Sequence, residues 1–111
     1  MTKEATEGLR YDTGKLRWDL LPPEIEEVVK VFTMGAVKYS DRNWELGMNY
    51  GRVIAAMFRH IFAWLKGETN DPESGLHHLA HAQWNILALL VYEKRGMTQF
   101  DDRGITIVKK T

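Results

Sequence analysis

The chain has 111 residues, and its 15 lysine and arginine residues balance 15 aspartate and glutamate residues at a formal net charge of zero. A chain of this length forms one domain with a small core, which we expect to span residues 1–111. The balanced charge excludes the basic surface that a protein binding duplex nucleic acid needs. Because cysteine is absent, disulfides and thiolate metal sites are excluded, and we expect a soluble cytoplasmic protein.

Residues 1–14 read as a mobile polar arm, in which Asp12, Thr13 and Gly14 form a turn signal. This arm lacks the apolar core of a signal peptide. The longest apolar run, residues 86–91, is too short to span a bilayer, so no membrane is expected as a partner.

The first helix is predicted over residues 23–39. Pro23 suits the first position of a helix. Acidic residues follow it in the first turn, where their negative charge interacts favourably with the positive end of the helix dipole. A loop rich in Asp, Asn and Gly comes next over residues 40–51. A second helix is predicted over residues 50–66, with alanines that permit close packing and large apolar residues between them.

The third helix is predicted to begin with Asp71 as its cap and Pro72 at its first position, and to end at Gly96. At about 24 residues it is the longest, and it is apolar on nearly every side, which indicates a central position. The tail, residues 97–111, is expected to be irregular or to form a short β-hairpin. Residues 105–108 (ITIV) show the alternation of side chains that is typical of a strand. The predicted fold is a compact all-α domain of three or four helices with a long central C-terminal helix.

All four histidines lie between residues 59 and 85: His60, His77, His78 and His81. Imidazoles between two apolar helical segments are costly to bury unless they bind something, so this cluster is where chemistry is expected. Four polar residues are spaced by four, three and four positions, which places them on one face of the third helix as a polar stripe: Ser74, His78, His81 and Asn85. A short loop makes the second and third helices an antiparallel hairpin, which brings His60 opposite this stripe.

Simpler interpretations stay open for each feature. Asp71 and Glu73 also suit plain helix capping, and the stripe also suits a polar seam that holds two helices in register. The acids of the first helix, including Glu27, also suit dipole compensation.

A resemblance that covers about residues 9–93 favours a functional interpretation. The chain resembles a bacteriophage family described as the dATP/dGTP diphosphohydrolase N-terminal domain in four ordered blocks: residues 11–22 (YDTGKLRWDLLP), 35–39 (GAVKY), 42–44 (RNW), and 59–60 (RH) with 71–82 (DPESGLHHLAHA). The resemblance implies hydrolysis of dATP or dGTP to the monophosphate and pyrophosphate, in the cytoplasm of an infected host, with a divalent metal.

For this chemistry the candidate catalytic residues are His78, His81 and Glu27, and the candidate ligands for Mg²⁺ or Mn²⁺ are Glu27, Asp71, Glu73 and His78. The candidate substrate-binding residues are Lys15, Lys38, Asn43, Trp44, Arg59, His60 and Asn85. Among them the cations suit phosphates, Asn43 suits a purine edge, and Trp44 suits stacking on the base.

The chain is also similar, in size and in its acidic first helix, to the all-α MazG-type pyrophosphohydrolases, which use a Glu-Glu-x-x-Glu segment and a later Glu-x-x-Asp segment. Here Lys30 follows Glu26 and Glu27, and the second helix has no acid, so that magnesium cage is not reproduced. Two other classes stay open: a module that captures a purine nucleotide without cutting it, and a structural helical oligomer. For the domain as a whole we expect a homo-oligomer, a dimer or tetramer.

Overall fold

The structure is a computed structural model, and it describes residues 6–104. Three α-helices form its body: α1 (Glu26–Lys38), α2 (Tyr50–Leu65) and α3 (His78–Lys94). Short 3-10 helices lie at Trp18–Leu20, Pro23–Ile25, Asn43–Leu46 and Thr98–Phe100. Apart from an isolated bridge between Asn70 and His77, residues 6–104 contain no strand, so the all-α prediction is confirmed for them.

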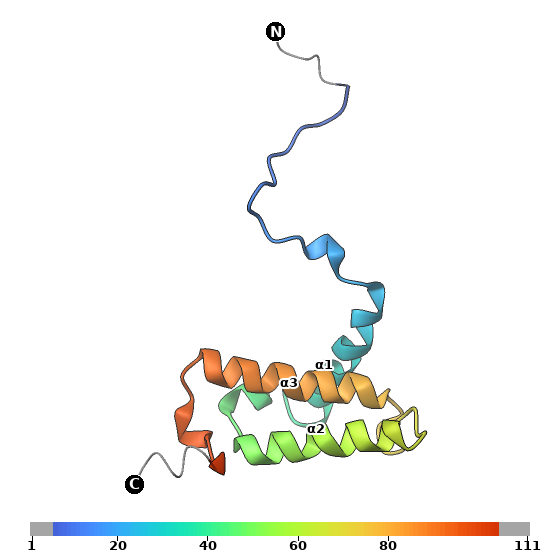
Figure 1. Ribbon diagram of the computed structural model, residues 1–111, viewed down its shortest axis with the longest axis vertical. Coiled ribbons are helices and arrows are strands. Elements are labelled where there is room, and N and C mark those ends of the chain that lie inside the picture. Colours follow the sequence, from blue (N-terminus) through green and yellow to red (C-terminus); the bar gives the residue numbers. More distant parts are fainter. Residues whose placement is uncertain (1–5, 105–111) are drawn as a thin grey trace.

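The three helices pack closely, but residues 6–25 extend away from them as an arm (Figure 1). The radius of gyration is 19.5 Å, well above the value of roughly 13 Å expected for 100 compact residues, and the arm accounts for the difference. The expected turn is present, because the Lys15 amide donates to the Asp12 carbonyl and Gly14 has a φ of +80°.

Helix α1 begins close to the expected place. Pro23 lies in a 3-10 turn directly before it, and Glu26 and Glu27 occupy its first turn. Val28 and Val31 form its buried face and pack with Ala80 of α3. Since α3 contacts both α1 and α2, it lies between them, as its apolar surface indicated.

The predicted start of the third helix is wrong. Asp71 and Pro72 lie in a turn, and the Gly75 amide donates to the Asp71 carbonyl at 2.7 Å while Gly75 adopts a φ of +75°. A left-handed residue interrupts a helix, so α3 begins only at His78 and has 17 residues rather than about 24. His77 is half-buried and caps α3, because its Nδ1 accepts from the Leu79 amide.

The described part of the tail folds back onto the start of α2. Phe100 packs against the core of Tyr50, Val53, Ala88 and Tyr92. The Gly51 amide donates to Asp102 Oδ1 at 2.7 Å, so a distant carboxylate caps α2. The alternating residues 105–108 lie outside the described residues. No helix within residues 6–104 is long and apolar enough to cross a membrane.

Candidate functional site

A cavity of about 1290 Å³ lies between α1, the loop that follows it and α2, with residues of α3 on one wall. All predicted substrate-binding residues except Lys15 line it: Lys38, Asn43, Trp44, Arg59, His60 and Asn85. His81, a predicted catalytic residue, lines it as well. The cavity therefore joins residues from the distant sequence blocks in one place.

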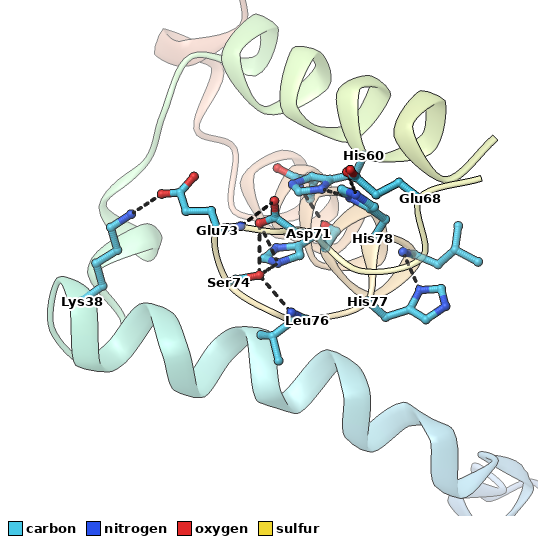
Figure 2. A network of polar contacts seen from close by, with 12 residues as sticks. Lys38, His60, Glu68, Asp71, Glu73, Ser74, Leu76, His77 and His78 are labelled. Atoms are coloured by element: carbon cyan, nitrogen blue, oxygen red, sulfur yellow. Dashed lines mark hydrogen bonds and ion pairs between the residues drawn. The ribbon is translucent and has the colours of Figure 1, made fainter. Parts of the chain in front are cut away.

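The remaining predicted residues lie elsewhere. Lys15 is exposed on the extended arm, and Glu27 pairs with Lys30 of its own helix at 3.1 Å. Glu73 is exposed and meets Lys38 Nζ at 3.6 Å, and Figure 2 shows this pair joining the loop before α3 to α1. Asp71 and His78 lie in the histidine cluster but not on the cavity wall.

Three imidazoles meet where α2 crosses the start of α3. His60 Nδ1 lies 2.9 Å from His78 Nδ1, and the His60 ring stacks on the His81 ring with centroids 4.4 Å apart and an interplanar angle of 5°. His78 Nε2 lies 2.7 Å from Glu68 Oε1, in the loop after α2 (Figure 2). The hairpin predicted from the sequence therefore does bring His60 to the stripe on α3.

The Ser74 hydroxyl connects a second carboxylate to the cluster. It donates to Asp71 Oδ2 at 3.1 Å, and it lies 2.7 Å from His81 Nε2. Asn85, one turn further along α3, donates from Nδ2 to the His81 carbonyl at 2.8 Å. Ser74 is not on α3, as the predicted stripe had it, yet it still contacts His81.

Burial lowers the pKa of His60, and the neighbouring His81 and His78 lower it further. Burial also lowers the pKa of His81, against the opposing effect of Asp71. For Asp71, burial alone raises the pKa, but hydrogen bonds from Ser74 and the Glu73 amide together with the histidines outweigh it, so the pKa is lowered. The surroundings therefore favour the neutral forms of His60 and His81 beside an ionised Asp71.

The predicted metal ligands are not gathered. Within residues 6–104 no three His, Cys, Asp or Glu side chains are placed to hold one metal ion. Glu27 and Glu73 pair with lysines, and both ring nitrogens of His78 face protein partners. The donor set Glu27, Asp71, Glu73 and His78 does not fit a metal centre in this structure.

Two of the cations on the cavity wall, Arg52 and Arg59, lie on one face of α2 at a spacing of seven residues. Neither forms an ion pair with any residue between positions 6 and 104. Sequence reasoning missed Arg52, although its spacing from Arg59 places both on one side of a helix. Two arginines on one wall suit the binding of an anion with several oxygens.

Aromatic rings form the other part of the wall. Trp44 packs edge-on against Phe32 and Trp84, each at 5.8 Å between centroids. Trp44 is half-buried in its loop. Stacking on a base would therefore use the part of the Trp44 ring that lines the cavity.

Comparison with known proteins gives two matches. The family model described as "dATP/dGTP diphosphohydrolase, N-terminal" matches residues 5–103. A "dATP/dGTP diphosphohydrolase" of Salmonella phage PMBT28 is 40% identical over 97 residues, which cover 86% of this chain and 33% of that protein. The chain thus spans about a third of the length of this relative. No solved structure matches.

Proposed function

The chain belongs to the family described as dATP/dGTP diphosphohydrolase, N-terminal, and from this premise we propose that its cavity binds a purine deoxynucleoside triphosphate and hydrolyses it to the monophosphate and pyrophosphate. The observation that carries the proposal is one cavity lined by Arg52 and Arg59, which form no ion pair within the described residues, by aromatic and amide side chains, and by two stacked imidazoles. Its volume of about 1290 Å³ exceeds the roughly 300–1000 Å³ of ordinary ligand pockets, so a nucleotide fits.

Cations from two helices line the cavity. Arg52 and Arg59 come from α2, and Lys38 comes from the end of α1. These three groups bind the triphosphate in the proposal, with the arginines as forks and the lysine as a point charge. Asn43 and Trp44 contact the purine.

The imidazole pair lies at the end of the same cavity. A neutral imidazole accepts a proton from water as the water attacks the α-phosphorus, and the low pKa of both rings keeps them neutral near pH 7. In the proposal His81, which contacts Ser74 and Asp71, belongs to this pair.

Dependence on Mg²⁺ or Mn²⁺ stays a prediction. Since the described side chains do not converge on a metal, no step of the reaction is assigned to one. Measuring hydrolysis with and without EDTA tests this part separately.

The test of the proposal is the His81→Ala variant of the full chain. We expect release of pyrophosphate from dATP and dGTP to fall by at least about 100-fold, because the ring that stacks on His60 and holds it in place is lost, while the helical circular dichroism stays that of the wild type. His77→Ala is the matched control, because His77 faces the start of α3 and not the cavity. An active His81→Ala enzyme contradicts the placement of His81 in the site.

A second candidate function is capture of the nucleotide without hydrolysis. The cavity favours it, because its basic and aromatic groups could hold a nucleotide without the metal ligands that residues 6–104 do not bring together. Stoichiometric protection of intact nucleotide distinguishes capture from turnover. The origin of the relative from Salmonella phage PMBT28 also supports the expected role in the cytoplasm of an infected host.

The expected homo-oligomer also stays a proposal. Phe58 and Phe62 on α2, and Ile86 and Leu90 on α3, are half exposed and follow helical spacing. If these side chains form one continuous surface, it would be typical of sites where proteins associate.

A further inference from the structure

His78 is hydrogen-bonded at both ring nitrogens, and this fixes where its proton lies. Its Nε2 lies 2.7 Å from Glu68 Oε1, and its Nδ1 lies 2.9 Å from His60 Nδ1. His78 is only 3% exposed, so water does not compete for either contact. Figure 2 shows Glu68, His78 and His60 in this order.

An ionised carboxylate only accepts hydrogen bonds, so a neutral His78 carries its proton on Nε2 and donates it to Glu68. Its Nδ1 is then an acceptor. The neighbouring Nδ1 of His60 must donate to it, because two acceptors 2.9 Å apart would repel. The proton of neutral His60 therefore lies on Nδ1, and its Nε2 carries the lone pair.

The structure leaves this lone pair available. His60 lines the cavity, and its Nε2 has no hydrogen-bond partner among residues 6–104. The same residues contain no buried side-chain nitrogen or oxygen without a partner, so His60 Nε2 is open to solvent. A water molecule in the cavity can reach it.

His81 carries its proton on the other ring nitrogen, Nε2. The only proton of the Ser74 hydroxyl goes to Asp71, so His81 Nε2 must donate to Ser74 Oγ. The nitrogen that faces Ser74 is therefore not a base. The His81 ring instead supports His60 by stacking on it at 4.4 Å.

We propose that His60 Nε2 is the general base of the cavity, and that Glu68 and His78 are the positioning residues that set its tautomer. This inference rests on the proposed function. As the water oxygen bonds to the α-phosphorus, its proton moves to His60 Nε2. The bond from the α-phosphorus to the bridging oxygen breaks, and the pyrophosphate leaves with the bonding electrons.

Several charged or titratable groups surround His60. His78 and His81 face it from α3, Asp71 faces it from the loop before α3, and Arg59 precedes it on α2. Glu68 acts on it through His78, and loss of its charge makes the His60 base weaker. Removal of that charge is therefore expected to change the pH dependence and not only the rate.

The test is Glu68→Gln in the full chain, since the half-exposed Glu68 can be replaced by an amide of the same size without loss of the fold. We expect kcat with dATP or dGTP to fall by about 10–100-fold at unchanged KM, and the acidic limb of the pH profile to move to lower pH. Glu93→Gln, an exposed acid near the far end of α3, is the matched control and keeps the wild-type profile. Wild-type kcat and pH profile in Glu68→Gln overturn the proposal.

Nitrogen-15 NMR of the histidine rings gives a readout that needs no activity. We expect the proton of His60 on Nδ1 and that of His78 on Nε2 in the wild-type chain. A His60 proton on Nε2 overturns the relay even in an active enzyme. A wild-type chain that releases no pyrophosphate overturns the proposed function and the base role together, while the tautomers still decide whether the Glu68–His78–His60 chain exists.

Discussion

The two ends of the α2–α3 pair carry opposite kinds of side chain. At one end Tyr50 and Val53 pack against Ala88 and Tyr92 as an apolar core. At the other end the imidazoles of α2 and α3 meet, and two carboxylates from the connecting loop join them. The same helix pair is thus expected to derive stability from one end and chemistry from the other, because burying imidazoles contributes less than burying apolar groups.

Removing a large side chain from the apolar end is expected to have the largest effect on stability. Tyr92 is fully buried, and its hydroxyl donates to the Trp44 carbonyl at 2.6 Å. Tyr92→Ala is expected to lower the free energy of unfolding by about 3–5 kcal/mol, which denaturant unfolding measures. Tyr11→Ala on the arm, where the side chain is 85% exposed, is the control and is expected to change it little. A stable Tyr92→Ala protein would show that the core lies elsewhere.

The tail provides a smaller test at the same end. Asp102→Ala removes the carboxylate that caps α2 through the Gly51 amide, and the expected loss is about 1 kcal/mol of unfolding free energy. Asp12→Ala, in the turn of the arm, is expected to cost less than half of that. Equal stability of both variants would mean that the tail does not stabilise α2.

The smallest expected effect is the pH dependence of stability that the histidines at the polar end produce. The pKa values of folded His60 and His81 lie below the ordinary value of 6.5, so between that value and the folded values the unfolded chain binds more protons. The stability they provide is complete above about pH 6.5 and is lost as the pH falls below it. Asp71, with a pKa below 3.8, contributes only at lower pH.

Denaturant unfolding between about pH 7 and pH 5 measures this effect. We expect the wild-type chain to lose stability over this interval and a His60→Asn, His81→Asn double variant to show a flatter dependence. A double variant with the full wild-type slope would assign the effect to other groups.

Much of the fold was predictable because the local signals agree with the packing. Pro23 and the acids after it begin α1, and the apolar spacing of α2 matches its buried face. The start of α3 was not predictable from the Asp71-Pro72 pair, because the same pair also begins a turn. Gly75 was the signal for that turn, since its positive φ ends any helix that starts at Pro72.

The sequence was enough to predict that the histidines of the site meet, but not which hydrogen bonds connect them. Helical spacing and the hairpin are enough to bring His60 to His78 and His81. Glu68 was missed because a loop residue has no periodicity to place it, and Arg52 was missed because an exposed arginine on a helix is common. Which side chains share a proton depends on distances of a few tenths of an ångström, and a sequence does not contain them.

The central claim is that this cavity hydrolyses a nucleotide rather than storing it. The most direct measurement counts the pyrophosphate released per chain when the purified protein meets excess dATP or dGTP. We predict many equivalents of pyrophosphate per chain. Recovery of intact nucleotide bound at one equivalent per chain with no pyrophosphate, or no binding at all, would contradict the account.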